Sequence, residues 1–347
     1  MCNYIIEFKY KSSFNAGSKA RDDVNYFLKD RGFELLEITL ANNKIKKLYQ
    51  LLTLKSKIKS IKNDSTVLIQ YPYNNNNLYL QSILKVLKLK NVKTICLIHD
   101  LYSLRFNKGK TIVSKEINIL NKFDVVIAHN DYMSKWLYSS GLKKTIINLE
   151  LFDYQTEDFQ IDSKVFDKNC IAIAGNLVKE KSGFIYKFNK QNLGETKINL
   201  YGNGFETKNS IENISYFGPK PPSKLPEEIK GGFGLIWDGP ELNECVGHYG
   251  EYMKYNNPHK LSLYIAAGLP VIVWDKAAIA EFVRKNKIGI VVDSINQLDS
   301  IVNRIDQDSY TNLQKNVLKI KSRVNEGYYI KKAVTKSFDF FKDKNQK

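Results

Sequence analysis

A chain of 347 residues is long enough for two domains, and its 43% hydrophobic and 26% charged residues are the composition of an ordinary globular protein. The formal net charge of +17 indicates anionic partners. No known nucleic-acid-binding motif accompanies the charge, so we expect an anionic membrane surface or a polyanionic substrate and no nucleic acid. The apolar runs are shorter than the roughly 20 residues of a membrane span, and the start lacks the features of a signal peptide, so we expect a cytoplasmic location.

The first half of the chain alternates apolar runs with helical patterns. We expect strands at residues 3–8, 33–40, 66–71, 93–100 and 124–130, and helices at residues 18–32 and 76–91. Between Ile38 and His99 the only acidic residue is Asp64, whereas lysine is frequent. The basic stretch at residues 44–62 is a candidate for docking on the inner face of the cell membrane. The alternative is a lysine bias that comes from an AT-rich genome.

The second half repeats the alternation after a polar segment at residues 153–167. We expect strands at residues 169–177, 197–204, 214–219, 231–237, 269–274 and 288–292, and a basic helix at the end. The pattern predicts an α/β protein with two Rossmann-like parallel-sheet domains, at residues 1–158 and 159–325. A C-terminal helix at residues 326–347 is expected to pack back toward the first domain. The cysteines, Cys2, Cys96, Cys170 and Cys245, lack the spacing of a metal or redox motif, so we expect them to be reduced.

The most informative segment is residues 252–274, YMKYNNPHKLSLYIAAGLPVIVW. Asn256 and Asn257 suit a helix cap, and Pro258 suits a first helical position. Lys260 then falls in the first turn, beside free backbone N–H groups and the positive end of the helix dipole. This combination predicts a phosphate or diphosphate site, and the alternative is an ordinary βα unit with a solvated lysine.

Other candidate residues directly follow apolar runs, because ligands bind outside the carboxyl ends of parallel strands. In the second half these are Asn176, Lys179, Lys181, Tyr201, Gly218 and Asp238. The chain has neither a Walker A sequence nor a GxGxxG fingerprint, which argues against nucleotide hydrolases and dehydrogenases.

The motifs resemble those of a known family. The segment at residues 252–274, the run GGFGLIWDG, the later AAIAEFV and IGIVVDSINQL, and the N-terminal FNAGSKARDDVNYFL and IHDLYSLR are similar to bacterial galactofuranosyltransferases of the GT-B fold. More distantly, the chain is similar to streptococcal glucosyltransferases that extend GlcNAc on serine-rich adhesins. The likeness covers nearly the whole chain and is strongest at residues 231–292.

The resemblance implies an inverting, metal-independent transferase that uses a UDP-sugar, above all UDP-galactofuranose, and no cofactor. It implies two domains facing each other across a cleft, with the donor in the C-terminal half and the acceptor in the N-terminal half. The residues that match its donor site are Lys260 for the diphosphate, its neighbour Asn257, Asn176 with Lys179 or Lys181, and Tyr201 and Gly218 for uracil and ribose. Ser262 and Asp238 are further candidates for the donor site, Asp238 for orienting the sugar.

Glycosyl transfer also needs a base that takes the proton of the acceptor hydroxyl. Asp100 is our candidate, because it ends the run TICLIHD and is expected at the carboxyl edge of the first sheet. His99 beside it points to the other side of the strand end, so one of the two is expected to face the acceptor. The alternatives for Asp100 are a helix N-cap and a salt bridge with Arg105.

The remaining expectations concern the acceptor side and the partners. The resemblance places the loop that ends at Gly17 and Ser18 over the cleft, and Tyr71 ends a strand where its ring would stack on a sugar. We expect a lipid-linked or oligosaccharide acceptor, contact with an anionic membrane and self-association. The rival hypotheses are a UDP-glucose- or UDP-galactose-dependent transferase, a UDP-GlcNAc 2-epimerase and a basic nucleic-acid-binding module.

Overall fold

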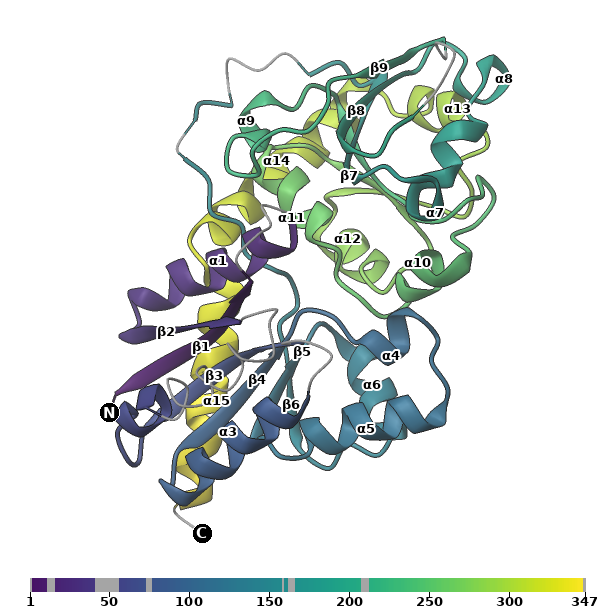
Figure 1. The fold of residues 1–347 in the computed structure, drawn as a ribbon. Coiled ribbons are helices and arrows are strands. Elements are labelled where there is room, and N and C mark those ends of the chain that lie inside the picture. Colours follow the sequence, from purple (N-terminus) through teal and green to yellow (C-terminus); the bar gives the residue numbers. More distant parts are fainter. Residues whose placement is uncertain are drawn as a thin grey trace. The chain divides into compact units, whose positions relative to one another are not determined.

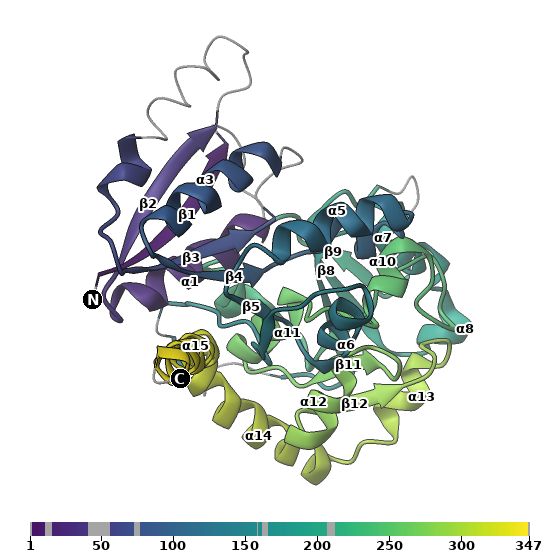
Figure 2. The same ribbon diagram turned by 90° about the horizontal axis from the view of Figure 1, so that it is seen from below.

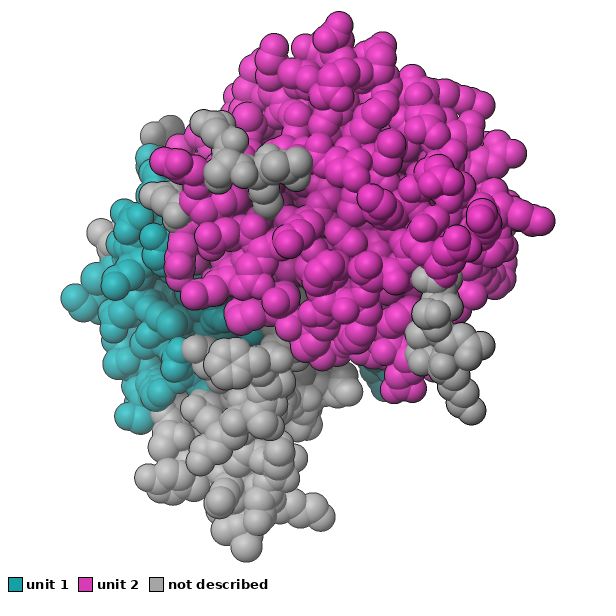
Figure 3. Space-filling view, turned by 90° about the horizontal axis from the view of Figure 1, so that it is seen from above, with its two compact units in different colours: residues 1–149, 329–347 teal, residues 150–328 magenta. Residues whose placement is uncertain are grey.

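The protein is described by a computed structural model that covers residues 2–10, 16–40, 56–72, 77–157, 159–161, 166–206 and 212–345. The chain divides into two compact units. Unit 1 contains Met1–Leu149 and Tyr329–Lys347, and unit 2 contains Glu150–Tyr328 (Figure 3). The ranges expected from the sequence, 1–158, 159–325 and 326–347, differ from these by a few residues, because the segment after Leu149 belongs to unit 2.

Unit 1 is built on a parallel sheet with the strand order β2-β1-β3-β4-β5-β6. Its strands are β1 (Asn3–Tyr10), β2 (Phe33–Leu40), β3 (Thr66–Tyr71), β4 (Lys93–Ile98), β5 (Val125–Ala128) and β6 (Thr145–Asn148). Its helices are α1 (Ala16–Lys29), α3 (Asn77–Leu89), α4 (Tyr102–Arg105), α5 (Lys110–Leu120), α6 (Asp131–Ser139) and α15 (Tyr328–Asn345). Strands β3 and β5 are buried along their whole length, which is why they are continuous apolar runs in the sequence.

The helices of unit 1 cover both faces of this sheet. Helices α1 and α15 lie on one face and α3 on the other (Figures 1 and 2). Phe338 of α15 stacks on Phe33 of β2 with a centroid distance of 6.1 Å, and the Lys331 ammonium lies 5.8 Å from the ring centroid of Phe27 in α1. These contacts fix the last helix of the chain to the first strands and helix of unit 1.

Unit 2 contains a second parallel sheet, with the strand order β12-β11-β10-β7-β8-β9. Its strands are β7 (Cys170–Asn176), β8 (Lys197–Asn203), β9 (Ile214–Tyr216), β10 (Phe233–Ile236), β11 (Val271–Trp274) and β12 (Gly289–Val292). Its helices are α7 (Lys179–Ser182), the 3-10 helix η1 (Gly183–Lys187), α8 (Lys190–Leu193), α9 (Leu225–Glu228), α10 (Gly247–Tyr252), α11 (His259–Ala266), α12 (Ala280–Asn286), α13 (Leu298–Asn303) and α14 (Gln307–Asn325).

Each sheet has a point where the direction of winding reverses. In unit 1 the neighbours β1 and β3 are followed by connections that run toward opposite edges of the sheet, and in unit 2 the same holds for β7 and β10. The loops that follow two such strands run in opposite directions. In doubly wound sheets, ligands bind between these loops, at the carboxyl ends of the strands. The topology therefore identifies one place in each unit where functional side chains are expected.

The remaining expectations from composition concern the cysteines, membrane-spanning helices and the basic stretch. Cys96, Cys170 and Cys245 are buried, and all the cysteines are free. In the described part of the chain, no helix has the length and apolar character needed to cross a membrane. Most of the basic stretch at residues 44–62 lies outside the described residues, which resume at Ser56.

Candidate active site

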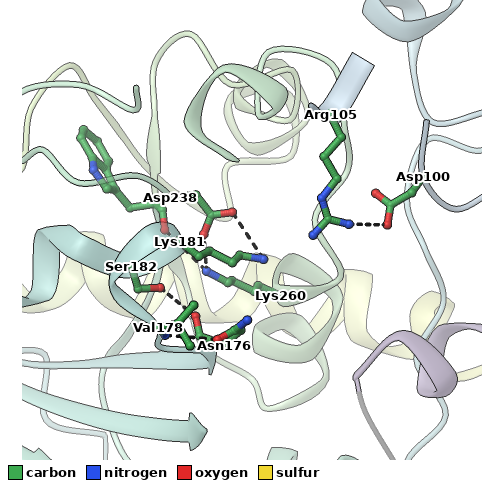
Figure 4. A network of polar contacts seen from close by, with 9 residues as sticks. Asp100, Arg105, Asn176, Val178, Lys181, Ser182, Asp238 and Lys260 are labelled. Atoms are coloured by element: carbon green, nitrogen blue, oxygen red, sulfur yellow. Dashed lines mark hydrogen bonds and ion pairs between the residues drawn. The ribbon is translucent and has the colours of Figure 1, made fainter. Parts of the chain in front are cut away.

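Two lysines and one aspartate converge at the winding reversal of unit 2. The ammonium nitrogen of Lys260 lies 2.8 Å from Asp238 Oδ1, and that of Lys181 lies 3.7 Å from Asp238 Oδ2 (Figure 4). The three side chains are largely buried, with 11% of Lys260, 20% of Lys181 and 9% of Asp238 exposed. Partial burial limits screening by solvent, so the excess positive charge of this group attracts an anion strongly.

Separate elements bring these side chains together. Lys181 is in α7, which follows β7; Asp238 follows β10; and Lys260 is in the first turn of α11. The hydroxyl of Tyr264 in α11 accepts a hydrogen bond from the Ala174 N–H (2.9 Å) and donates one to the Leu235 carbonyl (3.3 Å). Because Ala174 is in β7 and Leu235 in β10, this buried hydroxyl fixes α11 on the two strands that form the reversal.

Glycine at position 175 lies close to the stem of the lysine. Gly175 has φ +127°, which side chains rarely adopt, and a Cβ there would lie 3.4 Å from Lys260 Cε. The end of β7 therefore presents backbone to the stem of Lys260.

The sequence left Lys179 and Lys181 as alternatives, and the two lysines have different contacts in the structure. Lys181 faces Asp238, whereas the Lys179 ammonium lies over the ring of Tyr186, 5.1 Å from its centroid. Asn176 is exposed at the end of β7, and its Oδ1 accepts a hydrogen bond from the Val178 N–H (3.1 Å). Asn176 thus shapes the turn that carries Lys181 (Figure 4).

Helix α11 begins one residue later than expected. Helix α11 begins at His259, and Pro258 takes the N-cap position instead of the first helical position. Asn257 is 3% exposed and donates from Nδ2 to the Glu150 carbonyl (3.0 Å). Ser262 is fully buried and donates to the Phe152 carbonyl (2.6 Å). Both residues therefore hold the segment that enters unit 2, and neither side chain is open to a donor.

The residues expected at the uracil and the ribose are Tyr201 and Gly218. Tyr201 is 2% exposed, its ring stacks on Phe217 at 5.1 Å, and its hydroxyl accepts from the Lys230 N–H (2.9 Å). The Tyr201 side chain thus faces the interior of unit 2. Gly218, with φ +71°, has open space at its Cβ position, and its carbonyl accepts from the Gly202 N–H (3.0 Å).

An aromatic cluster that the sequence analysis missed lies near the carboxyl end of β8. Tyr186 stacks on Phe205 at 5.4 Å, and Phe205 contacts Tyr216 at 5.3 Å. Tyr216 is 45% exposed. The three rings are far apart in the sequence, so only the fold brings them together.

In unit 1, Asp100 and His99 follow β4 at the carboxyl edge. Asp100 Oδ2 accepts a hydrogen bond from Arg105 Nη1 (2.8 Å), and 38% of the Asp100 side chain is exposed (Figure 4). The salt bridge with Arg105 expected as an alternative is therefore present, and the N-cap of α4 is Leu101 rather than Asp100. His99 Nε2 lies 2.7 Å from Oε1 of Gln70, which is fully buried.

The three residues expected on the acceptor side have other surroundings. Tyr71 is 4% exposed, and its hydroxyl donates to Glu116 Oε1 (2.9 Å), so its ring is not presented to a sugar. Gly17 and Ser18 are in the first turn of α1 rather than before the helix, since α1 begins at Ala16.

Glu116 is a buried residue that the sequence analysis missed. Its carboxylate accepts hydrogen bonds from the backbone N–H groups of Tyr102 (3.2 Å) and Ser103 (3.1 Å), at the start of α4. The negative charge stabilises this helix start, which follows Asp100 directly. Glu116 thereby helps to position the loop that carries Asp100.

His129 makes the stability of unit 1 sensitive to acid. It is 1% exposed, its Nε2 lies 3.1 Å from the Ile98 carbonyl, and burial lowers its pKa from 6.5 to about 4 against the opposing charge of Asp100. The unfolded chain thus binds a proton at a higher pH than the folded chain, so the free energy of unfolding decreases as the pH falls from 6.5 to about 4.

We therefore expect His129→Gln to reduce the acid sensitivity. Between neutral pH and about pH 4, wild type should lose on the order of 3 kcal/mol more unfolding free energy than the variant. Urea denaturation of both proteins across this range measures the difference. Parallel pH profiles would contradict the assignment.

Within the described residues, no three His, Cys, Asp or Glu side chains are grouped as in a metal site.

Comparisons with known proteins agree along the whole chain. Residues 2–151 match the N-terminal domain model and residues 171–337 the C-terminal domain model of the glucosyltransferase 3-like family. The chain is 30% identical to the β-1,6-galactofuranosyltransferase WbbI of Escherichia coli K12 over 98% of this chain and 99% of the relative. It is 29% identical to glucosyltransferase 3 of Streptococcus gordonii over 77% of each chain.

A solved structure shows the same fold. The crystal structure of Anabaena HepE in complex with UDP has a TM-score of 0.63 and 11% sequence identity, over 98% of this chain and 100% of HepE. The sheets of both units and this likeness establish the GT-B fold expected from the sequence. The chain therefore belongs to the glucosyltransferase 3-like family and is a UDP-sugar glycosyltransferase.

Proposed function

We propose that the protein is an inverting, metal-independent galactofuranosyltransferase, which transfers galactofuranose from UDP-galactofuranose to a hydroxyl group of a glycan. The observation that carries the donor site is the convergence of Lys260 and Lys181 on Asp238 at the winding reversal of unit 2. The choice of sugar rests on the similarity to WbbI, which spans almost the full length of both chains.

The lysines stabilise the leaving group in this proposal. As the bond between the sugar carbon and the diphosphate oxygen breaks, its electron pair stays on the diphosphate, where negative charge accumulates. Lys260, Lys181 and the N–H groups at the start of α11 supply positive charge and hydrogen-bond donors for that oxygen. This is the charge that a divalent cation supplies in metal-dependent transferases, so we propose that none is required.

Asp100 acts as the base. The acceptor oxygen forms the new bond to the sugar carbon from the face opposite to the diphosphate, and its proton passes to the Asp100 carboxylate. Such a single displacement inverts the configuration at the sugar carbon. Asp100 is our candidate of the pair: 38% of its side chain is exposed and its Oδ2 accepts from Arg105, whereas His99 Nε2 lies 2.7 Å from the buried Gln70.

The aromatic cluster is the proposed place for the uracil ring. Tyr186, Phe205 and Tyr216 offer aromatic faces close to the carboxyl ends of β7 and β8. Stacking on an aromatic ring requires no specific hydrogen bond, so it is compatible with any uridine donor.

The proposed acceptor is an oligosaccharide or a lipid-linked glycan at the cytoplasmic face of the cell membrane. The net charge of +17 favours peripheral contact with anionic lipids there. Self-association of the enzyme is part of the same proposal.

A second candidate donor is UDP-glucose. It is favoured by the similarity to glucosyltransferase 3 of Streptococcus gordonii and by the two domain models of that family. Both candidates use the same lysines, because the diphosphate is common to them.

A thermal-shift titration distinguishes the donors. A ligand that binds the folded chain and not the unfolded chain raises the melting temperature by mass action. We expect UDP to stabilise the protein, UDP-galactofuranose to stabilise it most, and UDP-glucose, UDP-galactopyranose and UDP-GlcNAc to add less. The largest shift with UDP-glucose would select the second candidate, and no shift with any of these compounds would contradict the donor site. NMR of the product then tests inversion, and activity after treatment with EDTA tests metal independence.

A further inference from the structure

Unit 1 has a pocket at the amino ends of its strands, at the edge of the sheet opposite to Asp100. Its volume is about 790 Å³. The pocket is lined by residues of α3, by the first residues of β4, by the turn after α5 and by the residue before β6. It is therefore separate from the residues to which we assign the reaction.

Five lysines line this pocket. They are Lys85, Lys88, Lys93, Lys122 and Lys144. None of these ammonium groups has a hydrogen bond or ion pair in the described part of the chain. The one carboxylate in the lining, Asp124, accepts from the Thr94 N–H (2.8 Å) and hydroxyl (2.9 Å) instead of a lysine.

Unpaired charges of one sign around a concavity raise the local potential. Each lysine repels its neighbours, and this unfavourable term is removed when an anion enters. Lysine binds phosphate as a point charge with three donors, so the lining suits phosphate groups in more than one orientation. The charge alone is compatible with phosphate on a lipid, on a nucleic acid or in solution.

Leu89 distinguishes between these sources. It is the last residue of α3, next to Lys88 and four residues after Lys85, so it shares a helix face with Lys85. Leu89 is 81% exposed, compared with 57% for Tyr26, which ranks next among the described large hydrophobic residues. The apolar face of α3, with Leu80, Ile83 and Leu87, is buried, so Leu89 points away from the core.

We propose that this lysine pocket binds the phosphate headgroups of anionic phospholipids, with Leu89 inserted between the lipids beside them. Lysines at the headgroup level and an apolar side chain below it are the two contacts that hold peripheral proteins at a bilayer surface. The inference gives the proposed membrane contact a site, and it does not depend on which donor sugar the enzyme uses.

The test is co-sedimentation of the full-length protein with vesicles of phosphatidylcholine alone or mixed with phosphatidylglycerol. The variants are Lys85→Gln/Lys88→Gln/Lys122→Gln and, separately, Leu89→Ser. The matched controls remove the same charge and the same side chain from exposed positions of unit 2, with Lys230→Gln/Lys285→Gln/Lys315→Gln and Leu318→Ser. Melting temperatures and stabilisation by UDP show whether each variant is folded and keeps its donor site.

We expect wild type to bind the mixed vesicles, and binding to weaken as salt is added. The pocket variant should lose on the order of a hundredfold in partition coefficient, and Leu89→Ser about tenfold, while both controls bind nearly as wild type does. Equal losses in the pocket variant and its control would show that only total charge matters and would overturn the proposal. The same proteins are tested for binding to a single-stranded DNA oligonucleotide and to inorganic phosphate. The lipid assignment would be overturned if wild type bound either of these more tightly than the vesicles and Leu89→Ser left that binding unchanged.

Discussion

Lys260→Met is expected to lower kcat/KM for the UDP-sugar donor by a factor of about 100 to 1,000. Methionine matches the lysine side chain as far as Cε, the atom near Gly175, but removes the ammonium group that we assign to the diphosphate. Because negative charge on the diphosphate is greater in the transition state than in the bound donor, we expect kcat to fall as well as affinity. Initial rates at varied donor concentration measure both.

Lys179→Met is the matched control for this substitution. It removes a lysine from the same region, but the Lys179 ammonium lies over Tyr186 and not against Asp238. Its kcat should stay within a few-fold of wild type. Equal losses in Lys179→Met and Lys260→Met would mean that general charge, rather than the Lys260 contact, binds the donor.

A second variant separates catalysis from folding. Loss of Lys260 leaves the mostly buried Asp238 with Lys181 alone, at 3.7 Å, and an incompletely paired carboxylate lowers stability. The double variant Lys260→Met/Asp238→Asn removes that carboxylate. We expect it to recover much of the melting temperature and none of the activity. Recovery of both would show that Lys260 acts through folding.

The fold could be predicted from the sequence because parallel strands buried on both faces are continuous apolar runs. The strands expected in each half are present, and Lys181 and Asp238 come shortly after β7 and β10. Strand β6 was missed, because its four residues, Thr145–Asn148, include a single buried position and so lack a continuous apolar run.

The candidate donor site could be predicted only to the level of segments. Proline, lysine and glycine mark the start and the end of a helix locally, so the position of Lys260 in the first turn of α11 could be predicted. The choice between Lys179 and Lys181 depends on the direction of a short helical turn, which spacing does not specify. Tyr201 was misjudged because a side chain at a strand end faces either the ligand or the core, and one residue of register decides which.

The Glu116 contacts beside the loop of Asp100 could not be predicted from the sequence, whereas the salt bridge between Asp100 and Arg105 was an expected alternative. Glu116 is a single acidic residue in an amphipathic helix, where a solvated position is the usual expectation. Its partners, Tyr71 and Ser103, come from other elements, and only the folded chain brings them to it.

Asp100→Asn is expected to reduce kcat by a factor of about 100 to 10,000, with little change in donor affinity. Asparagine retains an oxygen that accepts from Arg105, so the local structure should persist, but the side chain no longer takes a proton. Stabilisation by UDP should match that of wild type, because the residues assigned to the donor belong to unit 2. Asp30→Asn, at an exposed position of unit 1, is the control for loss of a negative charge.

His99→Asn decides between the two neighbours. If Asp100 is the base, loss of the His99 contact with Gln70 should change kcat by less than the Asp100 substitution does, since His99 then acts only by positioning the strand end. A larger loss in His99→Asn, together with near wild-type turnover in Asp100→Asn, would transfer the base to His99. The Asp100 carboxylate is partly exposed, and the imidazole of His99 is hydrogen-bonded to the buried amide of Gln70. We therefore expect the larger loss of kcat in Asp100→Asn.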